Sequence, residues 1–298
     1  MDPSNAVENW LEELNNQGKS EHTRQAYRRA LAHFTAWYVE AYNLEFRPEA
    51  TLKRDVELWK SQLQKGGKAA PATINQRLVA LSSFFEWIHS QGLMRQKPTA
   101  GVSSVRLEKH GPKALSEQTL NRLMRAVYAG NNLRDIAMVE LLVGTGIRVG
   151  ELLDLKVGDL ELKPRSGDVT VRRGKHGSYR EIPLTIEVRK ALNAYLEDHK
   201  GKGDREAPLW QGQRGAIETR SAVIRMLEKY AIAARIEPIG PHVLRHTFAT
   251  RYLNANPGDL RGLAALLGHA SLNTVMIYTE PRMEDLAKRM ERVENKAI

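Results

Sequence analysis

Cysteine is absent from the 298 residues of this chain. Its absence excludes disulfide bonds and thiolate zinc sites, and it fits a reducing compartment such as the cytoplasm. A nucleophile must therefore be an oxygen, a lysine or a histidine. The sequence also lacks a metal-binding spacing such as HExxH, so we expect no metal and no other cofactor.

Long apolar runs are missing as well. No segment approaches the roughly 20 apolar residues that a membrane-spanning helix needs. The first residues, MDPSNAVENW, lack the basic-then-apolar order of a signal peptide. We therefore expect a soluble cytoplasmic protein that does not bind membranes.

What the chain does have is an excess of basic residues, with a formal net charge of +10. Residues 1–108 hold 14 Lys and Arg against 12 Asp and Glu, and the rest of the chain holds 31 against 23. Such an excess favours a polyanionic partner, with nucleic acid ahead of an anionic membrane. Basic proteins without such a partner share this composition.

The first hundred residues have helical periodicity and no strand pattern. Four helices are predicted, over 4–18, from Ser20 through Tyr38, over 52–63 and over 71–89. Pro71 lies in the first turn of the last one, where proline is tolerated. We predict a bundle of four or five helices.

Residues 97–114 contain two prolines, two glycines and no sustained periodicity, which indicates a linker. Later helices are predicted from Ser116 and over 133–143, 185–200, 221–234, 241–254, 259–267 and 273–278, with a polar tail helix after Pro281. DVTVRRGKHGSYREIPL, residues 168–184, predicts a β-hairpin around a glycine-bracketed turn. The predicted fold is mainly α in two domains, with a small β-hairpin or sheet in the second.

Two basic residues of the second half could contact phosphate. We expect Arg148, in GTGIRVGELLDL, just inside a helix, where it would lie near exposed backbone N–H groups, with Glu151 one turn further on to hold it. The alternative is an ordinary surface ion pair. Lys175, at the tip of the predicted hairpin, is either a solvated charge or a lysine delivered to a leaving oxygen.

A second group lies at the start of a predicted helix, PHVLRHTFAT. His242 and Arg245 are three residues apart and share its positive end, so together they could grip one phosphate and offer a proton. We expect Val243, Leu244 and Phe248 to form the packed side and leave His242 and Arg245 free. The neighbourhood of His246 suggests a structural role.

The segment GHASLNTVMIYT contains His269 and Tyr278 nine residues apart. By themselves they are typical of a helix-end histidine and a half-buried tyrosine. A tyrosine hydroxyl has a pKa of about 10 and attacks only when cationic groups favour phenolate and hold the electrophile in line.

In combination, the segments TGIRVGELLDL, the GK hairpin with REIPL, HVLRHTFAT and LLGHASLNTVMIYT resemble the tyrosine recombinases, the integrase family of Xer, integron and phage integrases. TRQAYRRALAHFTAWY and the helix after Pro71 are similar to that family's N-terminal core-binding domain. The similarity is greatest to short, Xer-like members, and every catalytic position matches the family's motif.

The resemblance implies a site-specific recombinase that cuts and rejoins duplex DNA through a 3′-phosphotyrosyl intermediate and a Holliday junction, without metal or ATP. It implies six catalytic residues: Arg148, Lys175, His242, Arg245, His269 and Tyr278. Tyr278 is the nucleophile, and the arginines neutralise the transition state. Lys175 protonates the 5′-oxygen, the histidines hydrogen-bond the phosphate, and Glu151 orients Arg148.

The implied architecture is a clamp around DNA. It consists of a SAM-like core-binding domain over 1–105, a linker over 106–114 and a catalytic domain with a tail helix over 115–298. Predicted DNA contacts in the first domain, which could equally be a solvated face, are Arg24, Arg28, Thr73, Gln76 and Arg77. We expect a homotetramer or heterotetramer on double-stranded recombination sites, with or without accessory proteins. The tail after Pro281 is expected to dock on a neighbouring subunit and so to couple the active sites.

Two other functions fit part of the pattern. A type IB topoisomerase shares this chemistry but relaxes supercoils as a monomer. A DNA-binding regulator could keep the fold without catalysis. The Xer-like first domain argues against the topoisomerase, and the complete catalytic set argues against the regulator.

Overall fold

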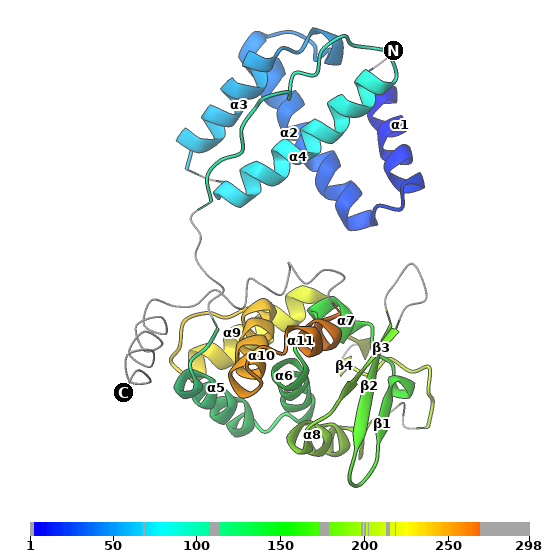
Figure 1. The fold of residues 1–298 in the computed structure, drawn as a ribbon, viewed down its shortest axis with the longest axis vertical. Coiled ribbons are helices and arrows are strands. Elements are labelled where there is room, and N and C mark those ends of the chain that lie inside the picture. Colours follow the sequence, from blue (N-terminus) through cyan, green and yellow to red (C-terminus); the bar gives the residue numbers. More distant parts are fainter. Residues whose placement is uncertain are drawn as a thin grey trace, which may run out of the picture. The chain divides into compact units, whose positions relative to one another are not determined.

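The computed structural model describes residues 3–67, 69–107, 114–172, 179–197, 199, 201, 203–212, 215–217 and 219–268. The chain divides into two compact units, Met1–Lys109 and His110–Ile298 (Figure 1). Each unit has its own hydrophobic core.

The described part of the first unit is helical, as its periodicity predicts. Its α-helices are α1 (Pro3–Asn16), α2 (Glu21–Tyr42), α3 (Lys53–Lys65) and α4 (Pro71–Ser90), and a 3₁₀ turn spans Pro48–Ala50. The Ser20 hydroxyl caps α2 by accepting the N–H of Thr23, and Asn43 ends this helix in the left-handed region. These caps define α2 as the long central element of the bundle.

Aromatic rings fill the core of this bundle. Phe34 on α2 is fully buried and meets Trp59 on α3 and Phe85 on α4 in edge-to-face contacts, with ring centroids 5.2 and 6.3 Å apart. Burial of such rings dominates the stability of a small core. Trp10 on α1 joins the cluster through Phe84, so aromatic contacts link all four helices.

The chain after α4 remains attached to this unit. The Asn75 side chain accepts the Val105 N–H at 2.7 Å and donates to the Val105 carbonyl at 2.9 Å. Lys60 donates to the Ser103 carbonyl at 2.6 Å. Residues 103–105 thus belong to the first bundle, while most of the predicted linker over 106–114 lies outside the described residues.

The second unit combines helices with two small antiparallel sheets. Its helices are α5 (Glu117–Ala129), α6 (Leu133–Thr145), α7 (Val149–Leu153), α8 (Ile186–Glu197), α9 (Arg220–Ala233), α10 (Pro241–Ala255) and α11 (Leu260–Leu267), with a 3₁₀ turn at Val157–Asp159. The strands are β1 (Leu160–Leu162), β2 (Gly167–Arg172), β3 (Tyr179–Pro183), β4 (Gln211–Gly212) and β5 (Gly215–Ala216). The sheet orders are β1-β2-β3 and β4-β5.

Helix α6 is the centre of the second unit. Its residues from Asp135 to Val143 are all buried, and it contacts α5, α8 and α10 (Figure 1). A helix that is apolar on all sides is stable only when neighbours cover it. Because α6 is enclosed in this way, the loop that follows it starts from a rigid base.

The predicted hairpin is confirmed as β2 and β3, with Val169 opposite Ile182 and both side chains facing the core. Strand β1 has no signal in the sequence, because three residues, LEL, are too short to show an alternation. The predicted helix over 273–278 and the tail after Pro281 lie outside the described residues.

Candidate active site

Arg148 lies at the tight turn that connects α6 to α7. Gly146 ends α6 in the left-handed region with φ 62°. The Thr145 hydroxyl donates to the Leu141 carbonyl at 2.6 Å and accepts the Ile147 N–H at 3.3 Å. These bonds fix the chain just before Arg148.

We predicted Arg148 inside a helix, but it is the N-cap of α7, with extended backbone at φ −70° and ψ 146°. The reason is the carboxylate of Glu151, which accepts the backbone N–H of Arg148 at 2.9 Å in the manner of a capping box. The cap holds the base of the arginine side chain in place.

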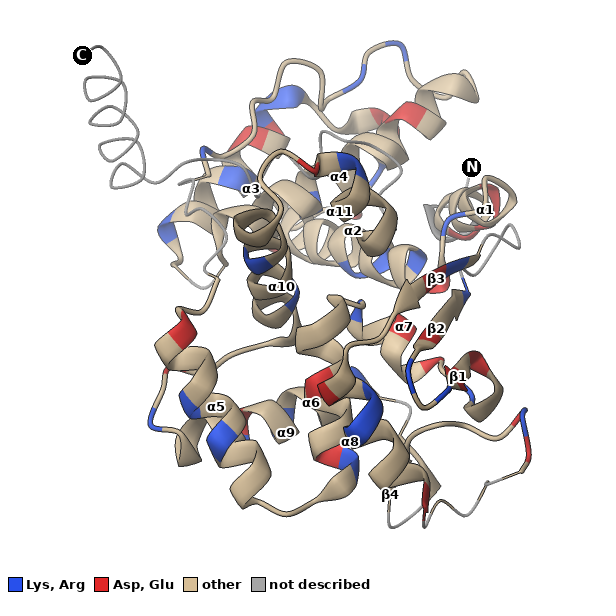
Figure 2. Cartoon of the chain, turned by 60° about the horizontal axis from the view of Figure 1, so that its bottom comes forward, with Lys and Arg blue, Asp and Glu red and all other residues tan. Residues whose placement is uncertain are grey.

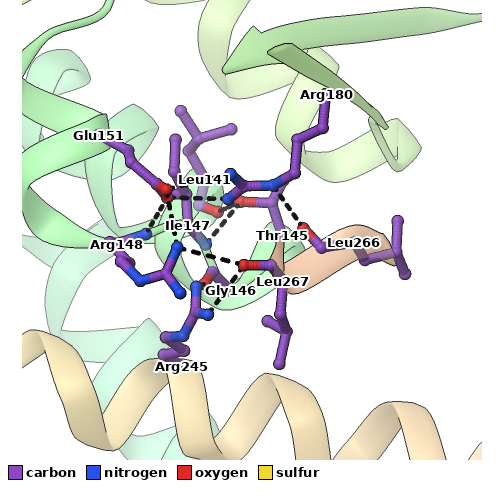
Figure 3. A network of polar contacts seen from close by, with 10 residues as sticks. All are labelled: Leu141, Thr145, Gly146, Ile147, Arg148, Glu151, Arg180, Arg245, Leu266 and Leu267. Atoms are coloured by element: carbon purple, nitrogen blue, oxygen red, sulfur yellow. Dashed lines mark hydrogen bonds and ion pairs between the residues drawn. The ribbon is translucent and has the colours of Figure 1, made fainter. Parts of the chain in front are cut away.

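The Glu151 carboxylate is also bound by two guanidinium groups (Figure 3). Nη1 of Arg148 donates to Oε1 at 2.9 Å, and Arg180 on β3 donates from Nη1 and Nη2 to the two oxygens at 3.0 and 2.8 Å. Burial alone raises the pKa of this carboxyl, but the hydrogen bonds and charges of Arg180 and Arg148 outweigh burial and lower its pKa to about 2. Glu151 is therefore a carboxylate at every working pH.

Arg245 on α10 lies beside Arg148. Its Nη1 donates to the Gly146 carbonyl at 2.6 Å, and its Nη2 donates to the Leu267 carbonyl at 2.9 Å. Nη1 of Arg148 approaches the same Leu267 oxygen at 3.4 Å (Figure 3). Two arginines from distant parts of the sequence thus meet at one oxygen atom.

The prediction that Arg245 is free of the packed side is wrong. The residue is only 5% exposed, because the carbonyls of Gly146 and Leu267 draw its guanidinium inwards. Gly146 follows α6, and Leu267 is the last residue of α11. Carbonyls at the C-terminal end of a helix have no N–H partner within the helix. A buried guanidinium satisfied in this way keeps its charge beside Arg148.

The end of α11 is the acceptor for all three arginines. Nε of Arg180 donates to the Leu266 carbonyl at 2.8 Å, next to the Leu267 carbonyl that Arg148 and Arg245 share. The negative end of a helix dipole favours such cations. The arginines therefore fix the point at which the chain leaves α11, and Gly268 follows in the left-handed region.

His242 is exposed in the first turn of α10, one turn before the buried Arg245. Arg148 is the most open of the three arginines, with 38% of its side chain exposed against 11% for Arg180. His246 is half-buried, and its pKa is lowered by burial and by the charges of His242 and Arg245. His242 and Arg148 are thus more open to solvent than Arg180 and Arg245.

Three predicted catalytic residues, Lys175, His269 and Tyr278, lie outside the described residues. Lys175 falls between the ends of β2 and β3, and His269 follows Gly268 directly. Their catalytic roles stay predictions.

The predicted DNA contacts belong to the first unit. Arg24 and Arg28 face solvent in part and are paired with carboxylates: Arg24 with Glu21, and Arg28 with Glu8 through two bonds of 2.7 and 2.9 Å. Gln76 is exposed, while Thr73 and Arg77 are half-buried on α4. Their binding of DNA stays a prediction.

Helix α8 carries both acidic and basic residues (Figure 2). Within the part of the chain that the structure describes, no group of three or more His, Asp or Glu side chains is placed to hold a metal ion. None of the helices described is long and apolar enough to cross a bilayer.

Comparison with known proteins identifies the family. Residues 113–285 match the phage integrase family, and residues 7–94 match the phage integrase N-terminal SAM-like domain. The chain belongs to the phage integrase family. The family and the activity of a site-specific tyrosine recombinase, which the motifs predict, are thereby confirmed.

Relatives in this family match over nearly the whole chain. Tyrosine recombinase XerC of Neisseria gonorrhoeae is 31% identical over 97% of this chain and 94% of its own length. Tyrosine recombinase XerD of Proteus mirabilis is 36% identical over 93% of this chain and 87% of its own length.

Solved structures share the fold. The XerA recombinase is 29% identical, with a TM-score of 0.54, over 97% of this chain and 98% of its own. A post-cleavage complex of XerH with palindromic difH is 23% identical, with a TM-score of 0.76, over 99% of this chain and 90% of its own. The mainly helical fold class with a small antiparallel sheet is confirmed.

Arg180 is a residue of this site that the motifs do not single out. It lies in REIPL, a segment that resembles the family pattern as a whole. A signal was present, however, since Arg180 precedes the buried Ile182 by two residues, and alternate residues of a strand face the same side. An arginine on the inward face of a strand requires a partner.

Proposed function

We propose that this recombinase cleaves duplex DNA with Tyr278 as the nucleophile and Arg148 and Arg245 as the groups that bind the scissile phosphate. The observation that carries the proposal is that these two guanidiniums meet at the Leu267 oxygen, two residues before His269 in the sequence. Two fixed positive charges suit the two non-bridging oxygens of a phosphodiester.

The exposure of the arginines supports a division of labour between them. Arg148 commits Nη1 to Glu151 and Leu267 and is partly open, so its Nη2 and Nε are the proposed phosphate donors. Arg245 is buried and adds a second positive charge beside Arg148. Such preorganised charge acts most strongly where water is excluded.

The proposed reaction is an exchange of phosphodiester bonds. The Tyr278 oxygen attacks phosphorus, the bond to the 5′-oxygen breaks, and Lys175 gives that oxygen a proton. His242 and His269 hydrogen-bond the phosphate and move the proton of Tyr278. A 5′-hydroxyl from a second duplex then attacks the 3′-phosphotyrosyl bond and releases Tyr278, so neither ATP nor a metal enters the balance.

The proposed partners are double-stranded recombination sites in the cytoplasm. Exchange between two duplexes needs four tyrosines, which favours a homotetramer or heterotetramer on DNA. The SAM-like first domain over 1–105, the linker over 106–114 and the catalytic domain over 115–298 would then enclose the duplex as a clamp, with the tail after Pro281 docking on the next subunit.

The test uses a duplex selected for binding from a random-sequence library and synthesised with a nick that lets the cleaved 5′ end diffuse away. In EDTA, the wild-type chain should form a covalent 3′-phosphotyrosyl adduct, and Tyr278→Phe should form none. An adduct that survives Tyr278→Phe contradicts the assignment of the nucleophile. Relaxation of supercoiled DNA without any exchange between sites favours a topoisomerase instead.

A further inference from the structure

Arg180 connects three elements of the second unit. From β3 it donates two hydrogen bonds to Glu151 on α7 and one, at 2.8 Å, to the Leu266 carbonyl at the end of α11. The fork-to-carboxylate geometry fixes distance and orientation together. Arg180 uses all three of its side-chain nitrogens in these bonds. Arg148 also contacts Glu151 and the end of α11, but through one side-chain nitrogen, Nη1.

Stability alone is a weak reason for this arrangement. The Arg180 and Glu151 side chains are only 11% and 13% exposed. Removing both charges from water offsets much of the attraction between them, so buried ion pairs are often replaceable by apolar residues. A role of Arg180 is therefore to be sought in its effect on Arg148, which binds the same carboxylate.

The charges of the cluster show what Arg180 does for Arg148. Two guanidiniums, of Arg148 and Arg180, bind the Glu151 carboxylate, and that of Arg245 shares the Leu267 carbonyl with Arg148, so these four side chains carry a net charge of +2. Without Arg180 the value falls to +1, and within the described part of the chain Glu151 keeps only Arg148 as a cationic side-chain partner. The carboxylate then competes with a phosphate for the Arg148 guanidinium.

The position of Arg180 along the chain adds a second effect. It lies five residues after Lys175, and its partner Leu266 lies three residues before His269. One guanidinium therefore joins the second strand of the hairpin to the end of α11, the helix that precedes His269 in the sequence.

We propose that Arg180 is a positioning residue for DNA cleavage, which saturates Glu151 so that Arg148 can bind phosphate and which joins β3 to the end of α11. This inference rests on the proposed function of Arg148. All three side-chain nitrogens of Arg180 already donate to Glu151 or Leu266, so we assign it no contact with the reacting atoms. Its loss is expected to slow the cleavage step more than it weakens DNA binding.

The experiment measures single-turnover cleavage of the nicked duplex and, separately, the Kd for the intact duplex. Arg180→Met should lower the cleavage rate about 100-fold, the size expected when a catalytic group is misplaced by about 1 Å, with Kd changed less than about threefold. Arg180→Lys should recover part of the rate and serves as the variant that preserves charge and folding. Arg189→Met is the matched control, since Arg189 also donates to backbone carbonyls in this unit, those of Lys163 and Pro164.

A double-mutant cycle with Glu151→Gln tests whether Arg180 acts through Glu151. In the Glu151→Gln background there is no carboxylate to saturate, so Arg180→Met should lower the rate only a few-fold further. The proposal is overturned if Arg180→Met lowers the cleavage rate equally in both backgrounds. It is also overturned if Arg180→Met cleaves at the wild-type rate, or if DNA binding falls as much as the cleavage rate. If the wild-type chain forms no Tyr278-dependent adduct, it is the proposed function that is contradicted, before Arg180 is tested.

Discussion

Arg245 donates a hydrogen bond of 2.6 Å from Nη1 to the carbonyl oxygen of Gly146. The donor comes from α10, and the acceptor ends α6, the central helix of the unit. A cationic donor to a carbonyl in a buried site is stronger than a neutral one. This bond ties the start of the Arg148 turn to the helix that carries His242.

Arg245→Lys should lower both activity and stability. A lysine has one nitrogen and cannot hold the two carbonyls of Gly146 and Leu267 in the geometry of a guanidinium. We expect cleavage to fall at least about 100-fold and the free energy of unfolding to fall by about 1–3 kcal/mol for the carbonyl left without its donor. Adduct formation and urea unfolding measure the two effects.

Arg251→Lys is the control for this change. Arg251 lies on the same helix but is 46% exposed on its side chain and pairs with Glu117 at the surface. Its replacement should leave both quantities near the wild-type values. If Arg245→Lys behaves like Arg251→Lys, the buried bonds of Arg245 have no role in cleavage.

Gly146→Ala should destabilise the second unit strongly. At φ 62° any Cβ is strained, and here it would lie 2.4 Å from Cδ1 of Phe248 and 2.9 Å from Cδ2 of Leu267. Strain of about 1–2 kcal/mol and overpacking of about 1–3 kcal/mol add together. Unfolding of this unit can be followed by fluorine NMR of fluorotryptophan-labelled chain, because Trp210 is its sole tryptophan.

Gly258→Ala separates the two contributions. Gly258 has φ 88° but no atom within 4 Å of an added Cβ, so only the backbone strain applies. It should destabilise by about 1–2 kcal/mol. Equal effects of the two substitutions would show that Phe248 and Leu267 move aside without penalty.

Much of the helical fold is predictable because local signals agree with the packing. Ser20 and Ser116 cap the helices that begin after them, and the apolar stripe of α4 is buried as its spacing predicts. The strand β1 is too short for a periodic signal, and its existence depends on pairing with β2, for example Leu160 with Val169. Tertiary pairing of this kind has no local signature.

Arg148 and Arg245 were predictable as members of one site, but their geometry was not. The order of the motifs assigns Arg148, His242 and Arg245 to one site. In the structure, Arg148 and Arg245 share the Leu267 carbonyl. The burial of Arg245 could not be read from its spacing, because the Gly146 and Leu267 carbonyls that attract it are 99 and 22 residues away. Backbone acceptors leave no trace in the side-chain pattern.

Stability should depend on Glu151 at acid pH. Its pKa in the folded chain is about 2, below the ordinary value of 4.5, so the stabilisation is complete above about pH 4.5 and is lost as the pH falls towards 2. The displacement corresponds to on the order of 3 kcal/mol. Urea unfolding followed through the fluorine signal of Trp210, between pH 6 and pH 3, measures this loss.

Glu151→Gln removes the titrating group and is the comparison for this measurement. The variant should be less stable than wild type at neutral pH, and the gap should narrow as the pH falls. A gap that stays constant from pH 6 to pH 3 contradicts the low pKa of Glu151.

Arg28 provides a test of the predicted DNA surface of the first unit. The Arg28 and Glu8 side chains are 50% and 60% exposed, and an exposed pair contributes little to stability, so Arg28 can exchange Glu8 for a phosphate. Arg28→Ala should then reduce the slope of log K against log salt by about 0.9, the value for one phosphate contact. Glu8→Gln, which frees the arginine, should tighten binding at low salt and keep the slope. If Arg28→Ala leaves the slope unchanged, this part of α2 is a solvated face, and the contacts of the first unit must lie elsewhere.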